Sequence, residues 1–542
     1  MNDRGKKAIK GKKEAGRRCP RLLQEITFIY VFLMLTVYPF YFRNKYYDIG
    51  NAKWQFFFFL TAGTGAILLS LLLFHVIEEW KTDEFKKAIR SIRLSATDRF
   101  VLVYAAAVLL STLFSPYKEQ VFWGYDGWYM GFVSQMCFAL IYFCVSRYWR
   151  WDISAVICCL AAAFLVFLLA ILMRFRIDPL SMYKGLEEQF KINFLSTIGQ
   201  ATWYSSYVAV LFPLGLFAFW FYDNKNVRIF GGIFTAAGFM TMVTQNSDSS
   251  FIAFGLLIFA LFWISMESNR AFRRFLEVMM MCFSCFKLIG ICQQLFPENA
   301  VPLDAISLFC SQSNMTWIIL IVTAICYFSF RWLEKYGKID ISKIKSIRIL
   351  FLWILLLGIG GIIIYIYLNT TKKLPVHLQS GNRYLLFDEY WGNNRGSSWM
   401  IAVKSFLKGD FVRKIFGCGP DGFSSFVQRF FYEELEMKWG SSGILACAHN
   451  EWLNALVNFG IAGTIPYIGI FLSAACRFFR KAKVHPELTA IVLSIICYMG
   501  HNFFCYQQII CTPILFILMG TGESIIRYGK KENNLKEADC SK

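Results

Sequence analysis

The sequence predicts an all-α fold of the polytopic helical membrane type, and three observations lead to this prediction. Hydrophobic residues make up 56% of the 542 residues and the mean hydropathy is +0.46, whereas soluble domains carry about 45–50% apolar residues. The apolar residues gather in blocks such as VFLMLTVYPFYF and ILFLWILLLGIGGIIIYIYL, which approach the roughly 20 residues that cross a bilayer as a helix. The strict alternation of a membrane β-barrel is absent from the sequence.

Apolar blocks recur along the chain and predict about fourteen membrane spans. In chain order we place them at residues 22–42, 56–76, 100–116, 131–147, 153–173, 202–222, 229–245, 251–268, 276–294, 312–331, 348–368, 453–475, 488–504 and 508–526. They divide the chain into a basic tail (1–21), an N-terminal transmembrane bundle (22–368), a large loop (369–452), C-terminal transmembrane helices (453–526) and a second tail (527–542).

The net charge of +20 is explained by topology. Most lysines and arginines fall in segments on the side of the two termini, and short cytoplasmic loops of membrane proteins carry this excess. We therefore predict that both termini are cytoplasmic and that the large loop is extracytoplasmic. The tail RGKKAIKGKKEAGRRCPR abuts a span, so its expected partner is anionic lipid and not nucleic acid.

The 17 cysteines predict neither a disulfide framework nor a metal centre. Most lie inside predicted spans, where cysteine behaves as a small hydrophobic residue. The large loop holds Cys418 and Cys447, and a disulfide between them is one possibility. Paired CxxC spacing is absent from the sequence; we therefore expect no metal and no cofactor.

The large loop is the most unusual polar segment. A structureless loop longer than about 15 residues is usually functional or disordered, and this one is rich in aromatic residues and glycine. The stretches SSWMIAVKSFLKG and GFSSFVQRFFYEELEMKW place apolar residues at helical spacing. The sequence therefore predicts short amphipathic helices at the outer mouth of the bundle.

Arginine is the first candidate for chemistry in this loop. A guanidinium is always charged and binds phosphate through two hydrogen bonds. Arg395, with Trp399 four residues later, is the stronger candidate, and Arg383 is the weaker one. Each has the alternative interpretation of a solvated loop arginine. The turn that contains Gly419 lacks the lysine of a P-loop, and by itself it is only a break between helices.

A titratable pair stands where the last part of the loop meets a helix. His449 precedes the predicted span, and Asn450 occupies the expected N-cap position. The positive end of a helix dipole keeps a nearby imidazole neutral, which is the form that a general base needs. The alternative is that His449 only caps the helix or binds a loop carbonyl. The dipeptide recurs at His501 and Asn502, where a structural hydrogen bond is the competing interpretation.

Together these pieces resemble the O-antigen ligase/polymerase family of bacterial multi-span glycosyltransferases. The resemblance is strongest over residues 380–475, which contain the arginine–tryptophan pair, the Gly-x-Gly-Pro turn and HNEWLNALVNFGIAG. STIGQATWYSS is similar to the family's upstream segment, with Gln200 where asparagine is usual. One position departs from the pattern: TQNSDSSFIAF has Asp248 where many members have arginine.

The resemblance implies a bacterial cytoplasmic (inner) membrane enzyme that transfers a glycan from an undecaprenyl-pyrophosphate-type lipid to an acceptor hydroxyl on a saccharide or a lipid-linked saccharide. Arg395 would stabilise the pyrophosphate and His449 would be the base, in a reaction without metal. Substrate-binding roles would fall to Asn450, Arg383, Trp399, Gly419, Gln200 and His501. A polymerase of surface polysaccharide is favoured over a ligase.

Two alternatives belong to other classes of protein. A flippase for lipid-linked oligosaccharides would also be a large helical bundle, although transporters tend to show internal repeats that we do not find in this sequence. An inactive scaffold for surface assembly is the other alternative. Loss of glycan transfer after replacement of His449 or Arg395 distinguishes the enzyme from both.

Overall fold

The computed structural model describes residues 3–79, 93–440 and 443–540, and it is helical through most of that length. Within this described part, the only strands are β1 (Phe194–Leu195) and β2 (Gly199–Gln200). They form an antiparallel pair in which Phe194 lies opposite Gln200. The prediction of an all-α polytopic fold is confirmed in class.

The helices follow one another with short connections. Up to residue 244 they are α1 (Asp3–Thr36), α2 (Ile49–Glu79), α4 (Ala96–Phe114), α5 (Lys118–Trp123), α6 (Phe132–Tyr148), α7 (Ile153–Arg174), α8 (Glu188–Lys191), α9 (Ala201–Phe221) and α10 (Lys225–Thr244). They continue with α11 (Asp248–Ser265), α12 (Asn269–Leu295), α13 (Ala305–Gln312), α14 (Asn314–Lys335), α15 (Ile347–Thr370), α16 (Trp391–Lys408), α17 (Phe411–Phe416), α18 (Phe423–Phe430), α19 (Tyr432–Trp439), α20 (Glu451–Lys481), α21 (Glu487–His501) and α22 (Thr512–Cys540).

Eleven helices of the described part are long and apolar enough to cross a membrane, which makes the chain a multi-pass membrane protein. Each of the fourteen predicted spans overlaps a helix. Three of them, however, are not among the eleven: α6 has 17 residues, α21 has 15, and α22 is the third. The number of crossings and their direction stay predictions.

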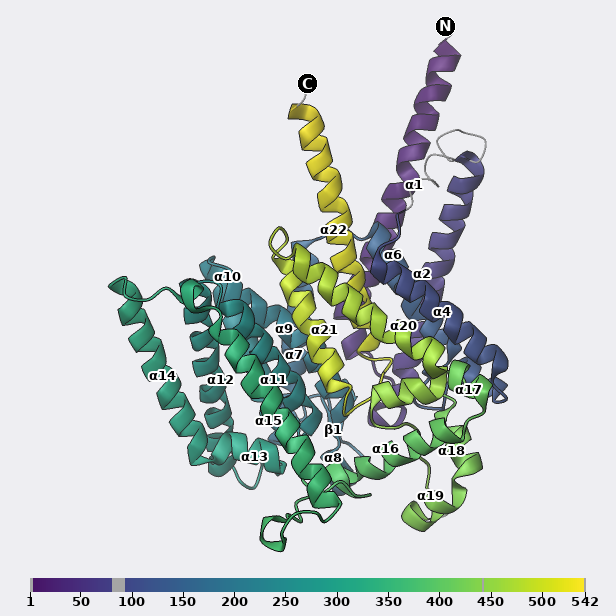
Figure 1. The fold of residues 1–542 in the computed structure, drawn as a ribbon. Coiled ribbons are helices and arrows are strands. Elements are labelled where there is room, and N and C mark those ends of the chain that lie inside the picture. The colour runs from purple at the N-terminus through teal and green to yellow at the C-terminus, as the bar shows by residue number, and fades with distance from the viewer. Residues whose placement is uncertain (1–2, 80–92, 441–442, 541–542) are drawn as a thin grey trace.

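The two chain ends lie at one end of the bundle and the large loop lies at the other (Figure 1). We call the first the termini end, where α1 begins and α22 finishes, and the second the loop end, where α16, α18 and α19 lie. This arrangement agrees with the expected opposite placement of the tails and the large loop. The side chains of the basic tail up to residue 18 lie outside the described part, so lipid binding there stays a prediction.

The predicted short helices of the large loop are present. SSWMIAVKSFLKG falls in α16, and the second amphipathic stretch divides into α18 and α19. They share a small apolar core that includes Ile401, Phe423 and Phe426. This core packs against α20, which bends at Gly460, a residue with a φ of +62° whose Cβ would lie 2.3 Å from the Ile415 carbonyl oxygen. The loop is therefore folded onto the bundle.

Buried ion pairs join four helices at the termini end. Asp98, on α4, is fully buried and binds Arg147 of α6 at 3.0 Å and Arg527 of α22 at 2.5 Å. Glu523, also buried, binds Arg527 at 3.1 Å and Arg477 of α20 at 2.7 Å. Because each carboxylate has two arginine partners, the desolvation of these charges is compensated.

We expect Asp98→Ala to lower the free energy of unfolding by about 3 kcal/mol, because it leaves two arginines without their buried partner. Thermal unfolding of the purified protein measures the loss. The matched control is Glu25→Ala, which removes an exposed pair with Arg21 and is expected to cost less than about 1 kcal/mol. Equal unfolding temperatures for the two variants would contradict a structural role for the network.

Candidate functional site

A polar cavity of about 610 Å³ lies at the loop end of the bundle. We call it the polar pocket. Residues from five separate segments of the chain line it, among them Gln200, Asp248, Asp304, Arg395 and His449. Three residues proposed from the sequence, Gln200, Arg395 and His449, therefore meet at one cavity, together with the unusual Asp248.

The polar pocket is surrounded by helix N-termini. Gln200 is the N-cap of α9, Ser247 that of α11 and Asp304 that of α13, and all three line the cavity. His449 directly precedes the N-cap of α20, and Arg395 follows three left-handed residues at the start of the regular part of α16. Each N-terminus carries about half a positive charge and unpaired N–H groups. Their convergence favours the binding of an anion.

Arg395 has the geometry of a ligand-binding arginine. It is partly buried, and its Nη1 donates to the Gly392 carbonyl oxygen at 3.1 Å. Its Nε is buried and has no hydrogen-bond partner among the described residues. Gly392, Asn393 and Asn394 all have a positive φ between 56° and 67°, a conformation that non-glycine residues adopt at an energetic cost. The strained turn directs Arg395 to the cavity and leaves a charged donor unsatisfied.

His449 is held as a neutral imidazole. Its φ is +50°, and its ring packs against Tyr506 with 5.4 Å between the ring centres. Burial lowers the pKa of His449 to about 4, and the charge of Arg395 lowers it further in the same direction. A positive neighbour and a poorly hydrated site both disfavour the imidazolium form. His449 is therefore unprotonated at neutral pH.

Asn450 is occupied by a structural role. Its Oδ1 accepts hydrogen bonds from the backbone N–H groups of Trp452 (3.0 Å) and Leu453 (3.1 Å), and the side chain is buried. This is the N-cap that the sequence predicts. The cap sets the direction in which α20 begins and so places His449 at the cavity.

Tyr506 connects two of the predicted residues and was missed from the sequence. Its hydroxyl donates to Gln200 Oε1 at 3.2 Å and accepts from Trp203 Nε1 at 3.3 Å. The same ring contacts His449. Its only sequence signal is its place in the polar turn GHNFFCYQQ, where His501 and Asn502 attracted attention instead.

The acidic side of the polar pocket was also only partly foreseen. Asp248 Oδ2 accepts a hydrogen bond from the Tyr384 hydroxyl at 2.6 Å. Burial and the Asp248 carboxylate together raise the pKa of Tyr384, which stays a donor. Asp304, which the sequence analysis did not single out, lines the same cavity, and burial raises its pKa. Two carboxyl groups therefore stand beside Arg395 and His449.

Four of the predicted substrate-binding residues do not line the polar pocket. Arg383 is exposed, and Trp399 packs in an aromatic cluster with Trp391 and Phe504, at ring separations of 5.0 and 5.5 Å. His501 is fully buried, and its Nε2 lies 2.7 Å from Ser205 Oγ. The fourth residue, Gly419, is described next.

Gly419 shapes the loop fold at a distance from the cavity. Its φ is +105°, and a Cβ there would lie 2.5 Å from Val121 and 2.9 Å from Ser115. Its N–H donates to the Asn458 carbonyl oxygen at 2.9 Å. The Gly-rich turn therefore anchors the large loop to α4, α5 and α20.

The possible disulfide between Cys418 and Cys447 is not present, because both are free thiols. Cys418 Sγ lies 3.7 Å from Asn458 Oδ1, in the contact that anchors the turn. Cys447 belongs to a different cluster, with Cys505 and Tyr506. Burial raises the pKa of both thiols, that of Cys418 to about 12.

Comparison with known proteins found no relatives: no family model matches the sequence, and no curated protein matches it.

We expect the His449 imidazole to titrate near pH 4 and to stay neutral above about pH 5. Removing the neighbouring charge with Arg395→Gln should raise the pKa of His449, although burial, the larger cause, keeps it below the usual value of about 6.5. Histidine NMR of labelled protein, with His449→Gln to assign the signal, measures both values. An unchanged pKa in Arg395→Gln would show that the two groups do not interact.

We expect Gly419→Ala to lower folding stability by about 2 kcal/mol, because alanine at a φ of +105° is strained and its Cβ meets Val121 and Ser115. Thermal unfolding measures this effect. The control is Gly381→Ala, in the same loop, where a Cβ would have no neighbour within 4 Å. A stable Gly419→Ala protein with weakened substrate binding would restore the direct role that the sequence suggested.

Proposed function

We propose that this chain is a metal-independent glycosyltransferase similar to the O-antigen ligase/polymerase family. Its donor would be a glycan on an undecaprenyl-pyrophosphate-type lipid, and its acceptor a hydroxyl group of a saccharide or a lipid-linked saccharide. The observation that carries the proposal is the meeting of Arg395, His449 and several helix N-termini at one polar pocket.

The anion-binding side of the pocket supports a diphosphate donor. As the bond between the anomeric carbon and the pyrophosphate oxygen breaks, negative charge grows on the leaving lipid pyrophosphate. Arg395, with an unpartnered buried Nε, supplies a charged donor, and the helix N-termini supply fixed positive potential. Groups of this kind, already oriented before the reaction, are what stabilises charge that develops in a transition state.

The neutral imidazole supports a role for His449 as general base. It would accept the proton of the acceptor hydroxyl while that oxygen forms its bond to the anomeric carbon. The proton then resides on the imidazole, and the lipid pyrophosphate leaves with the bonding electron pair. A base must be unprotonated to act, and burial and Arg395 favour that form of His449.

The remaining residues fit supporting roles. Gln200 and Tyr506, joined by a hydrogen bond, would hold the sugar or orient the imidazole. Trp391 and Trp399 form an aromatic surface on α16, the same helix that carries Arg395, and such surfaces stack on sugar rings as readily as they anchor at a membrane interface. Asn450 and Gly419 would act through the fold, and Asp248 takes the place of a second cationic phosphate ligand.

The proposal places the reaction on the extracytoplasmic face of a bacterial cytoplasmic membrane, in surface polysaccharide assembly, with polymerisation favoured over ligation. Purified protein, the lipid-linked glycan and an acceptor test it together. Longer glycan chains and free lipid pyrophosphate support the enzyme. Movement of the intact lipid-linked glycan between leaflets, without release of pyrophosphate, would establish a flippase, and neither result would favour a scaffold.

We expect Arg395→Ala and His449→Ala each to reduce glycan transfer at least about 100-fold, the usual effect of losing a charge-stabilising donor or a base. The matched control is Arg383→Ala, an exposed arginine in the same loop, which should retain most of the activity. Surface glycan profiles and protein abundance in membranes are measured side by side. Full transfer by both pocket variants at normal abundance would remove the catalytic assignment.

A further inference from the structure

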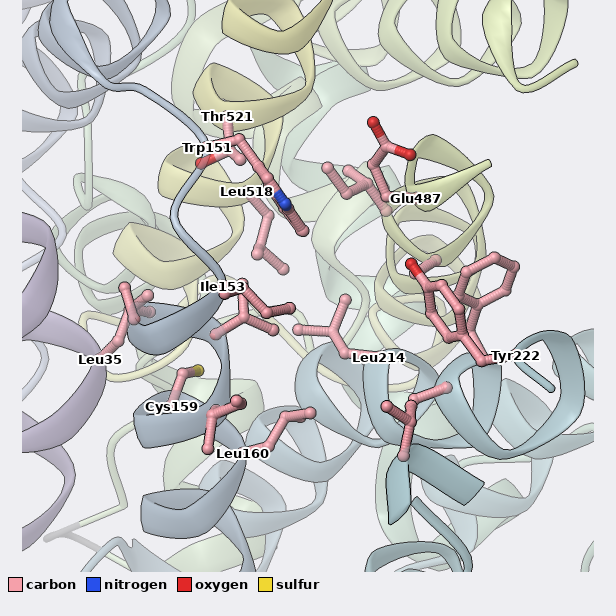
Figure 2. A pocket seen from close by; sticks show the side chains of 18 of the residues that line it. Leu35, Trp151, Ile153, Cys159, Leu160, Leu214, Tyr222, Glu487, Leu518 and Thr521 are labelled. Atoms are coloured by element: carbon pink, nitrogen blue, oxygen red, sulfur yellow. The ribbon is translucent and has the colours of Figure 1, made fainter. Parts of the chain in front are cut away.

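A second cavity, lined mainly by apolar side chains, lies toward the termini end of the bundle. It has a volume of about 350 Å³ and lies between α1, α7, α9, α10, α21 and α22. We call it the apolar cavity. Figure 2 shows Leu35, Cys159, Leu160 and Leu214 on its walls. A volume of this size is within the range of small-molecule sites.

The apolar cavity is separate from the polar pocket. Ala201 of α9 lines the polar pocket and Ala218 lines the apolar cavity. At 1.5 Å per residue, these positions are about 25 Å apart along the helix. The proposed transfer reaction therefore does not explain the second cavity.

One buried polar atom at the apolar cavity lacks a partner. Trp149 lines it and is 3% exposed, and its indole Nε1–H has no hydrogen-bond acceptor among the described residues. Its ring is fixed by stacking on Phe28, with 5.6 Å between ring centres and 8° between planes. A buried N–H without an acceptor is costly, so a ligand that carries an acceptor oxygen would relieve this cost.

Further polar groups lie on one side of the apolar cavity. Figure 2 shows Trp151, Tyr222 and Glu487 away from the wall that Leu35, Cys159 and Leu160 form. Trp151 is 43% exposed and Tyr222 36%, and such residues are typical of the level of lipid headgroups. An apolar chamber with a polar rim fits an amphiphile.

The charge of the rim selects among amphiphiles. Glu487 is the only ionisable carboxylate among the described residues that line the apolar cavity, and no lysine or arginine is among them. Its Oε1 lies 3.4 Å from His485 Nδ1, and its side chain is 22% exposed. A carboxylate repels an anionic headgroup and attracts a cationic one, most strongly where the cation donates N–H groups.

We propose that the apolar cavity binds one membrane phospholipid whose headgroup carries a primary ammonium. An acyl chain occupies the apolar walls, and a phosphate or ester oxygen accepts the Trp149 Nε1–H. The ammonium donates to Glu487. Because this ligand contacts helices from both the first and the last part of the chain, it binds only the folded protein and therefore stabilises it.

The test compares phosphatidylethanolamine, phosphatidylcholine and phosphatidylglycerol with identical acyl chains. Delipidated protein in mild detergent is given each lipid, and native mass spectrometry and thermal unfolding report retention and stabilisation. We expect one phosphatidylethanolamine to be retained about tenfold more than either other lipid, since only its headgroup donates charge-assisted hydrogen bonds to Glu487. Equal retention of all three lipids, preference for phosphatidylglycerol, or no retained lipid would overturn the proposal.

Two variants separate the parts of the site. Glu487→Gln should abolish the preference for phosphatidylethanolamine over phosphatidylcholine but keep lipid retention, and Trp149→Phe should weaken retention of all phospholipids. The matched controls are Glu298→Gln, an exposed loop position, and Trp353→Phe, 59% exposed on α15, which should both behave as the natural protein. An unchanged preference in Glu487→Gln would refute the headgroup assignment. Glycan transfer is not part of this readout, so the two proposals succeed or fail separately.

Discussion

The electrostatics of the polar pocket depend on one constraint: the N-termini of several helices end at the same small volume. α9, α11, α13 and α20 begin at or beside residues that line it, and the regular part of α16 begins at Arg395. Their dipoles create a positive region that no single side chain explains. This potential, together with Arg395, disfavours protonation of His449 and suits the pocket to an anionic ligand.

The architecture maintains this convergence by anchoring the large loop from several directions. The Gly419 turn binds the bent part of α20 through Asn458, and the small core of α16 and α18 packs on the same helix. At the far end of the bundle, Asp98 and Glu523 join α4, α6, α20 and α22 through buried ion pairs. The loop residues that line the pocket are therefore held on a rigid frame, as a preorganised site requires.

Much of the fold was predictable from the sequence, because membrane spans have a strong signal. Every predicted span overlaps a helix, and the amphipathic stretches of the large loop became α16, α18 and α19. The short helices α6 and α21 show the limit of that reasoning: hydropathy locates an apolar segment, but its helical length depends on where neighbouring segments allow it to end. The break between α18 and α19 likewise has no clear sequence signal.

The sequence by itself determined the class of fold, the placement of a folded polar loop between two sets of spans, and the N-cap at Asn450, because each depends on local pattern. Only the tertiary structure decided which polar residues share a cavity. It joined Gln200, Arg395 and His449, added Tyr506 and Asp304, and placed Arg383, Gly419 and His501 elsewhere. The physical reason is that proximity between distant segments arises from helix packing and loop anchoring, which local propensity does not encode.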